Sequence, residues 1–345
     1  GTGLASLLTL FLLPRFWRQL PLDRGRDHAV GSKVAAGKPT GGGLLVVIFL
    51  IPCLALVLPF SARLWEIVGC LVLCMLTGYL DDRSEKPWGE LMKGGLDLVV
   101  AILTSLVLCQ GQDTVIWLPL IQGGVTIPAW AFVPVSSCIL WFSINATNCS
   151  DGVDGLAGSL TLLSLFYLGA LLYVVIGHRE VADYLLVPHR PLGAAWALLV
   201  FTSAGGLAGY LWHNAQPSAI LMGDAGSRFL GLLVGIAVMV SGSPVLILVA
   251  APVVLANGGT GLFKIVLLRF FRWLGCDISP PADEPGRGKR RPEEHVIRLL
   301  HRVRFPLHDH CRNRLGWSNT QVLLRFVLLQ AFITPLLLVL LLKLR

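Results

Sequence analysis

Three short polar segments carry closely spaced carboxylates, and each lies beside a long apolar run. They are Asp81-Asp82, the segment Asn145–Asp154, and the segment Met222–Ser227, which contains Asp224. Carboxylate oxygens bind Mg²⁺, and Mg²⁺ in turn binds phosphate groups. Because ionisable groups within or beside membrane spans are functional more often than structural, these segments predict one reaction site for a phosphate compound.

The pair Asp81-Asp82 closes an apolar run and is predicted to stand at the C-terminal end of a helix. Negative charges at that end oppose the helix dipole, so helix stability does not explain them. We interpret the pair as ligands of Mg²⁺, or of a phosphate-bearing partner held through Mg²⁺. An ordinary solvated helix end is the alternative.

The segment Asn145–Asp154 repeats polar residues in steps of three, which places them on one face if a helix continues through the segment. Its members are Asn145, Asn148, Asp151 and Asp154. The alternative is a short loop in which Asp151-Gly152 forms a turn and Asp154 caps the next helix. That alternative leaves both asparagines unexplained, so the functional interpretation is favoured.

Asp224 is a candidate metal ligand, and Gly223 and Gly226 would let the backbone approach a phosphate closely. A helix cap with a turn is the alternative for this segment. Asn214, ten residues upstream, is predicted to end the preceding span beside it.

Two further motifs have weaker signals. His308 and His310 lie in a basic loop and could contact phosphates or transfer protons; a solvated pair, or a zinc site with Cys276 or Cys311, are the alternatives. The run Gly37–Gly43, which contains Thr40, could cradle a phosphate on its N–H groups or simply be a flexible entry to a helix. It is not a P-loop, because the required spacing is absent.

The elements that must hold these residues are membrane helices. The chain has 345 residues, of which 54% are hydrophobic and 14% charged, with a mean hydropathy of +0.72. Uncharged runs of about 20 residues span a membrane as helices, so the sequence predicts an all-α polytopic membrane protein of about ten spans. The first, which lacks a basic leader, is read as a span and not as a signal peptide. The predicted spans cover residues 2–19, 43–61, 65–80, 94–111, 129–146, 155–176, 191–212, 227–241, 244–268 and 319–342.

The loops after the odd-numbered spans share one face, and with them lie 23 of the 28 Lys and Arg residues. By the positive-inside rule that face is cytoplasmic and both termini lie outside. The net charge of +8 suits anionic lipid and not nucleic acid. Residues 1–345 are predicted to form one domain, with a Pro-rich linker at 280–292 and a short β-hairpin at about 113–128 on the outer face. The cytoplasmic loops are placed at about 20–42, 81–93, 146–155, 213–226 and 269–318.

Taken in order, these motifs resemble those of the polyprenyl-phosphate N-acetylhexosamine-1-phosphate transferases, most closely their phospho-MurNAc-pentapeptide branch. The resemblance covers nearly the whole chain, through Pro-Thr-Gly-Gly, Gly-x-Leu-Asp-Asp, Asn-Ala-x-Asn-x-x-Asp-Gly-x-Asp-Gly-Leu, Met-Gly-Asp-x-Gly-Ser and a His-containing loop. It implies transfer of phospho-MurNAc-pentapeptide from a UDP carrier to undecaprenyl phosphate, forming lipid I and UMP with Mg²⁺ in peptidoglycan synthesis. It also implies a bacterial inner-membrane location, an active site on the cytoplasmic face, and a homodimer.

The resemblance also implies roles for individual residues. Asp81 and Asp82 match an acidic pair that engages or activates the lipid phosphate, and Asp224 matches a metal-binding carboxylate. Asp151 belongs to a motif that lines the nucleotide and metal site. The implied catalytic residues are Asp81, Asp82, Asp224 and His308. The implied substrate-binding residues are Thr40, Lys93, Asn145, Asn148, Asp151, Asp154, Asn214 and His310.

Several alternatives stay open at the level of sequence. The run Lys38-Pro-Thr40-Gly and the sequence His308-Asp309-His310 depart from the usual family pattern, so UDP-GlcNAc or another UDP-HexNAc is the alternative substrate. Direct in-line attack on the UDP-sugar is preferred to a two-step route through an aspartyl-phosphate on Asp224. A transporter of an anionic lipid-linked sugar is the rival class, although it would need polar residues near the bilayer midplane.

Overall fold

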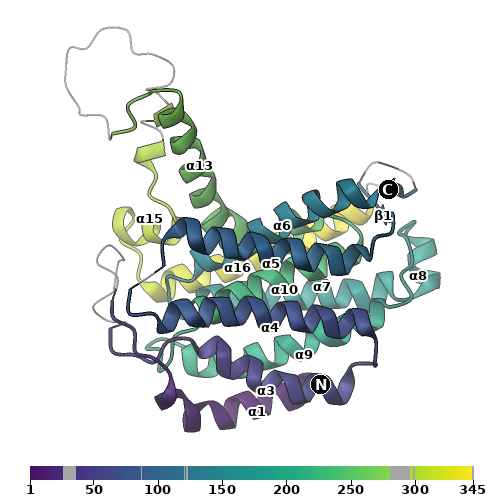
Figure 1. The fold of residues 1–345 in the computed structure, drawn as a ribbon, viewed down its shortest axis with the longest axis horizontal. Helices are drawn as coiled ribbons and strands as arrows, with labels where there is room; N and C mark the ends of the chain where they lie inside the picture. Colours follow the sequence, from purple (N-terminus) through teal and green to yellow (C-terminus); the bar gives the residue numbers. More distant parts are fainter. Residues whose placement is uncertain are drawn as a thin grey trace.

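The computed structural model describes residues 1–25, 36–86, 88–119, 121, 123–279, 296–297 and 300–343. The predicted linker at 280–292 and parts of the predicted loops 20–42 and 269–318 lie outside these residues. The described chain forms a bundle of roughly parallel and antiparallel helices with one small β-hairpin (Figure 1). The longer helices are α1 (Thr2–Phe16), α3 (Gly42–Val57), α4 (Ala62–Arg83), α5 (Glu90–Cys109), α6 (Ala129–Ser150), α7 (Leu156–Ala170), α9 (Gly193–Asn214), α10 (Gly223–Ser241), α13 (Thr260–Trp273) and α16 (Asn319–Lys343).

Eight helical segments among the described residues are long and apolar enough to cross a membrane, and α3 is a shorter apolar helix of 16 residues. Each of the ten predicted spans contains a helix, but the sixth ends in a π-helical segment at Leu171–Ile176 and the ninth is not one regular helix. It consists of α11 (Leu246–Ala250), α12 (Pro252–Val254), a π-helical turn at Leu255–Gly259, and α13. Pro252 lacks the N–H that a continuous helix would need, which accounts for the break.

Helix α10 lies at the centre of the bundle, where α3, α4, α6, α7 and α9 pack around it. Its sequence is apolar or small on all sides beyond Arg228, as expected of a helix with no face toward solvent or lipid. Small residues permit this crowding: a Cβ at Gly231 would overlap the backbone of Ile144 in α6. The residues that α10 carries are therefore held from several sides.

The predicted break after span eight is confirmed, because α10 ends at Ser241 and Gly242 follows with φ +83°, the usual glycine helix stop. The predicted hairpin is also confirmed. Strands β1 (Thr114–Ile116) and β2 (Val125–Ile127) pair antiparallel, with Thr114 opposite Ile127. The buried Trp117 ties the hairpin to α10 by donating its indole N–H to the carbonyl of Ser241 at 3.0 Å.

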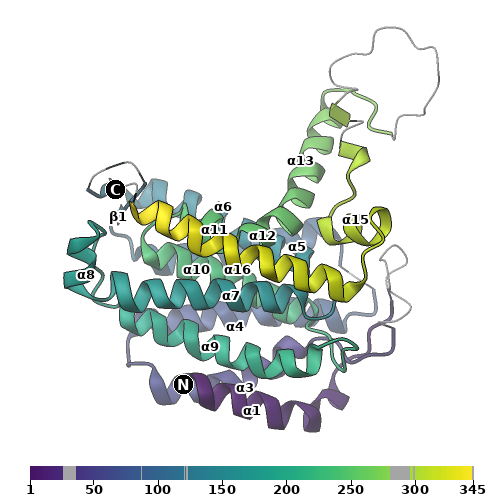
Figure 2. The same cartoon turned by 180° about the vertical axis from the view of Figure 1, so that it is seen from behind.

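The two ends of the bundle differ. Helix α13 projects beyond one end, with α15 (Leu307–Arg314) beside its base (Figure 2). The hairpin, the short helix α8 (Arg179–Tyr184) and the start of the chain lie at the opposite end. The three polar segments singled out from the sequence lie at the α15 end, where α4, α6 and α9 finish and α10 begins.

Candidate active site

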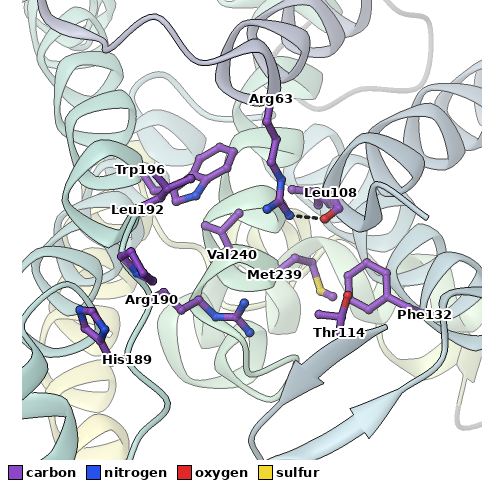
Figure 3. Close-up of a pocket in the computed structure, with 11 residues that line it drawn as sticks. Arg63, Leu108, Thr114, Phe132, His189, Arg190, Leu192, Trp196, Met239 and Val240 are labelled. Atoms are coloured by element: carbon purple, nitrogen blue, oxygen red, sulfur yellow. Dashed lines mark hydrogen bonds between the residues drawn. The ribbon is translucent and has the colours of Figure 1, made fainter. Parts of the chain in front are cut away.

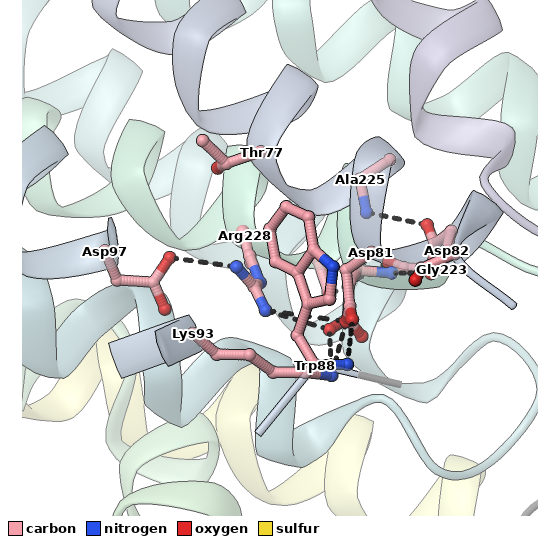
Figure 4. A network of polar contacts seen from close by, with 12 residues as sticks. Thr77, Asp81, Asp82, Trp88, Lys93, Asp97, Gly223, Ala225 and Arg228 are labelled. Atoms are coloured by element: carbon pink, nitrogen blue, oxygen red, sulfur yellow. Dashed lines mark hydrogen bonds and ion pairs between the residues drawn. The ribbon is translucent and has the colours of Figure 1, made fainter. Parts of the chain in front are cut away.

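Six charged side chains from three helices meet where α4 ends, α5 begins and α10 begins (Figure 4). We call this group the acid–base cluster. Its members are Asp81 and Asp82 of α4, Lys93 and Asp97 of α5, and Asp224 and Arg228 of α10. Four carboxylates face two cations, so with every group ionised the cluster has an excess of two negative charges.

The two cations link the three helices. Lys93 forms ion pairs with Asp81 and, at 3.1 Å, with Asp224. Arg228 contacts Asp224 at 3.0 Å and Asp97 at 3.3 Å, and its Nη2 lies 3.8 Å from Asp81. Arg228 and Asp97 are fully buried. Buried charges need partners to offset their desolvation, so this network fixes the relative positions of α4, α5 and α10.

Asp82 has a different role from its neighbour. Its Oδ1 accepts the backbone N–H of Asp224 at 2.9 Å, and its Oδ2 accepts that of Ala225 at 3.0 Å. These are free N–H groups of the first turn of α10, and no side chain of α10 itself caps them. Asp82 therefore caps α10 from another helix. Gly223, at φ +70°, has no room for a side chain, because a Cβ there would meet the Asp82 carboxyl carbon at 2.9 Å.

The predicted boundaries of these segments are wrong by up to one helical turn. Helix α4 continues to Arg83, so Asp81 and Asp82 lie inside its last turn and not in a loop. Helix α10 begins at Gly223, so Asp224 lies in its first turn, where the helix dipole favours a negative charge. The capping hypothesis for Asp224 is also wrong, since the cap comes from Asp82.

The segment Asn145–Asp154 is part helix and part turn. Helix α6 continues through Ser150, so Asn145 and Asn148 lie on its last turns and Asp151 follows as its C-cap. Asp154 does not cap α7, whose N-cap is Gly155. Instead its Oδ2 accepts the backbone N–H of Ser218 at 3.2 Å and lies 3.7 Å from the Lys38 ammonium. The one-face prediction holds only for the two asparagines.

Asn214 joins two loops at this end of the bundle. Its side-chain oxygen accepts the N–H of Gly155 at 2.8 Å, and its amide nitrogen donates to the carbonyl of Ile220 at 2.8 Å. It is buried. Asn214 thus positions the turn that carries Asp151 and Asp154 against the loop that leads into α10.

The glycine run before α3 is largely a structural entry to that helix. The N–H groups of Gly42 and Gly43 donate to the carbonyls of Leu221 and Met222, so they are not free to cradle a phosphate. Thr40 is buried, and its backbone N–H is bonded to Pro21. Through these hydrogen bonds the start of α3 packs against the start of α10.

His308 is brought from the far C-terminal part of the sequence to the turn that follows α6. It lies in α15 and not in a loop, and it is buried. Its ring presses on Gly152, where an added Cβ would come within 2.8 Å of Cε1. The oxygen of Asn257 accepts the backbone N–H of His308 at 2.9 Å and lies 3.1 Å from Nδ1. An amide oxygen has no proton, so Nδ1 carries the hydrogen and Nε2 keeps its lone pair.

Burial lowers the pKa of His308 to about 4, with Asp309 opposing and Arg312 adding to the shift. The imidazole is therefore neutral at pH 7, and its Nε2 lies beside Gly152 and 3.7 Å from an Asp309 carboxylate oxygen. His310, two residues on, lies on another side of α15 and accepts the backbone N–H of Arg304 at 3.3 Å. The sequence analysis treated the two histidines as one motif, but in the structure they have different partners.

Sequence reasoning missed Arg228 and Asn257, and it left Asp97, which lies just inside the fourth predicted span, out of the predicted site. Two signals were present. Arg228 follows Asp224 by four residues, the spacing of helix neighbours, and Asp97 is an ionisable residue within a span. For Asn257 no signal was available, because its partner His308 is 51 residues away.

No three His, Cys, Asp or Glu side chains converge to hold a metal among the residues that the structure describes. Mg²⁺ does not require such a cage, since it usually takes one or two carboxylates with phosphates and water. The excess negative charge of the acid–base cluster fits a divalent cation. The zinc hypothesis for Cys276 or Cys311 gains no support from the described residues.

The bundle is that of a multi-pass membrane protein, and the acid–base cluster lies at one end of its spans. The chain belongs to glycosyl transferase family 4, whose family model matches residues 64–242. It is similar to the phospho-N-acetylmuramoyl-pentapeptide-transferase of two strains of Treponema pallidum, with 46% identity over 98% of this chain and 87% of theirs. The enzyme of the same name from Nautilia profundicola is 28% identical over 99% of this chain and 93% of its own.

Proposed function

We propose that the protein transfers phospho-MurNAc-pentapeptide from UDP-MurNAc-pentapeptide to undecaprenyl phosphate, forming lipid I and UMP. The observation that carries this proposal is the acid–base cluster at the end of an apolar bundle, in a chain that keeps 46% identity to a phospho-N-acetylmuramoyl-pentapeptide-transferase along nearly its whole length. A soluble UDP-sugar can reach such a site from water, while a polyprenyl chain lies beside it in the membrane.

The proposal includes an orientation. With ten crossings, both termini lie outside and the α13–α15 end, where most basic residues gather, faces the cytoplasm of a bacterial inner membrane. Undecaprenyl phosphate in the inner leaflet and a cytoplasmic UDP-sugar would then meet at the same level as the acid–base cluster. A homodimer is part of the proposal only through the family resemblance.

We propose direct in-line attack of the lipid phosphate oxygen on the β-phosphorus of the UDP-sugar. The attacking phosphate is mostly ionised near neutral pH, so it needs positioning more than a strong base. Lys93, which is partly exposed, is placed to hold phosphate oxygens. The buried Arg228 positions Asp224, and Asp81 and Asp82 fix α4 and α10 around the site. Bound Mg²⁺, held by Asp224 and Asp151, would supply charge neutralisation for the departing UMP. Thr40, Asn145, Asn148, Asp154, Asn214, His308 and His310 are proposed to bind or position the substrates.

The experiment gives purified protein undecaprenyl phosphate and Mg²⁺ with UDP-MurNAc-pentapeptide or with UDP-GlcNAc, and measures UMP release. We expect UMP from the pentapeptide substrate only. We expect Asp224→Asn to lower the rate by about 100-fold or more, as for the loss of a group that stabilises transition-state charge. Arg269→Gln, an exposed change on α13, is the control.

Other outcomes have distinct meanings. UMP from UDP-GlcNAc would keep the reaction and change the sugar. Trapping a phosphorylated enzyme from the UDP-sugar alone would replace direct attack by the two-step route. If neither substrate gives UMP, the transporter hypothesis takes precedence. It is disfavoured by the position of the charged groups, of which only Asp97 and Arg228 lie deeper than the first turn of their helices from that end.

A further inference from the structure

A second polar site lies at the opposite end of the bundle, where a cavity of about 190 Å³ opens between helix ends (Figure 3). Its walls come from the first turns of α4, α6 and α9, the segment 189–192 before α9, the last turns of α5 and α10, and β1. Arg63 at this cavity precedes Asp81 by 18 residues on the same helix, which separates the two sites by about 27 Å. The cavity is therefore distinct from the acid–base cluster.

Two arginines point into this cavity. Arg63, in the first turn of α4, donates to the carbonyl of Leu108 at the end of α5. Arg190, just before α9, donates from Nη2 to the carbonyl of Val115 in β1. These bonds orient both guanidinium groups toward the same space, as Figure 3 shows. The Nε atoms of both arginines are buried and lack a hydrogen-bond partner in the described structure.

Among the described residues, no carboxylate balances these charges. Neither arginine forms an ion pair with any of them, and Asp113, next to the lining residue Thr114, accepts the backbone N–H of Ala129 on its Oδ1. Burial and, secondly, the charge of Arg63 lower the pKa of Arg190, but an arginine stays protonated at neutral pH. The guanidinium of Arg190 lies against Gly242 at the C-terminus of α10, whose dipole offers only about half a charge.

We propose that Arg63 and Arg190 form a binding site for a phosphate group, supplied by the headgroup of an anionic membrane lipid. Planar guanidinium groups match phosphate oxygens in pairs, and two of them around one cavity suit a single phosphate. Thr114 and His189 add polar groups to the walls, while Phe132, Trp196 and the partly exposed Leu192 supply an apolar part that suits the first carbons of a lipid chain. The site stands at the end of the spans, the level at which headgroups lie. Free phosphate shares this chemistry and is tested separately.

The test uses native mass spectrometry of the detergent-purified protein, titrated with phosphatidylglycerol, with phosphatidylcholine, or with inorganic phosphate. The variants are Arg63→Gln, Arg190→Gln and the double variant. Arg179→Gln is the matched control, because Arg179 lies on α8 at the same end and is 82% exposed. We expect phosphatidylglycerol to bind the unaltered protein and Arg179→Gln equally. We expect the double variant to bind it about tenfold more weakly or worse, as for loss of charge-assisted hydrogen bonds.

UMP release serves as the control for folding of the double variant. Because neither arginine is near the acid–base cluster, we expect the double variant to release UMP at the unaltered rate, and that result would show that the variant folds. Should the glutamine variants not fold, the unaltered protein still tests the site: phosphatidylglycerol must be retained over phosphatidylcholine and lost as salt is raised. Binding of inorganic phosphate that depends on both arginines would support the site with a soluble anion as its source. Anionic-lipid binding that is equal in the double variant and Arg179→Gln would overturn the proposal.

Discussion

His308 shows how burial sets the chemistry of one side chain. The chain encloses its ring between Gly152 and Asn257, and the Asn257 oxygen selects the tautomer that leaves Nε2 as an acceptor. A solvated histidine would be partly protonated near pH 6.5, whereas this one stays neutral because burial lowers its pKa to about 4. The imidazole of His308 is therefore neutral near pH 7.

This pKa has a consequence for stability. Between pH 6.5 and 4 the unfolded chain protonates this histidine while the folded protein does not, so stability falls as the pH falls through that window. The whole effect amounts to at most about 3 kcal/mol. We expect the unfolding temperature of the unaltered protein to decline from pH 6.5 toward pH 4, and His308→Asn to show a shallower decline.

His310→Gln is the matched control, since it removes an imidazole from the same helix two residues away. Thermal unfolding in detergent, followed by tryptophan fluorescence across this pH range, provides the comparison. An equal slope in His308→Asn and the unaltered protein would show that His308 is protonated in the fold.

At the scale of elements, the acid–base cluster holds α5 to α10. Asp97 and Arg228 are fully buried. Arg228 has two further carboxylate partners, Asp224 and Asp81, whereas among the described residues Asp97 forms an ion pair with Arg228 alone. The two residues therefore do not contribute symmetrically to the packing. Removing the arginine leaves a buried carboxylate without its cation, but removing the carboxylate leaves the arginine paired.

We expect Arg228→Met to destabilise the protein by about 3–5 kcal/mol, the usual cost of breaking a buried pair from one side. Asp97→Asn should cost much less, and adding it to Arg228→Met should restore part of the lost stability. Unfolding temperatures of the two single variants and the double variant test this. Arg269→Met, which breaks an exposed pair with Glu90, should change little. A double variant less stable than Arg228→Met would refute the asymmetric account.

The helices themselves were largely predictable, and the contacts between them were not. Apolar length and the Gly242–Pro244 break place α4, α5, α6, α7, α9 and α10 from sequence, because a membrane span has few alternatives. The short helix α8, which is not a span, was not predicted. The pairing of Asp82 with the start of α10 joins residues 142 positions apart, and nothing local indicates it. Likewise the two asparagines of α6 follow from helix periodicity, whereas the partner of Asp154 is set by the loop before α10. Local patterns fix elements, and tertiary packing decides which side chains meet.

At the scale of the whole molecule, the two ends of the bundle have separate chemistry. One end carries the acid–base cluster, α15 and the projecting α13, and the other carries the hairpin, α8 and the arginine cavity. The basic residues of the sequence gather at the first end, which predicts that it faces the cytoplasm. Substrates of the proposed reaction would meet at that face, and lipid headgroups of the other leaflet would reach Arg63 and Arg190.

This orientation can be tested with a thiol reagent that does not cross membranes. Cys276 follows α13 at the acid–base end and is partly exposed, whereas most other cysteines are buried. In right-side-out vesicles we expect Cys276 to stay unlabelled until the membrane is permeabilised. A Cys276→Ser variant carrying Arg179→Cys on α8 should be labelled without permeabilisation, because that side chain lies at the opposite end and is exposed. Cys276→Ser alone reports labelling of the other cysteines. Labelling of Cys276 in sealed vesicles would show the opposite orientation. The acid–base cluster would then lie on the side of the membrane that UDP-sugars do not reach.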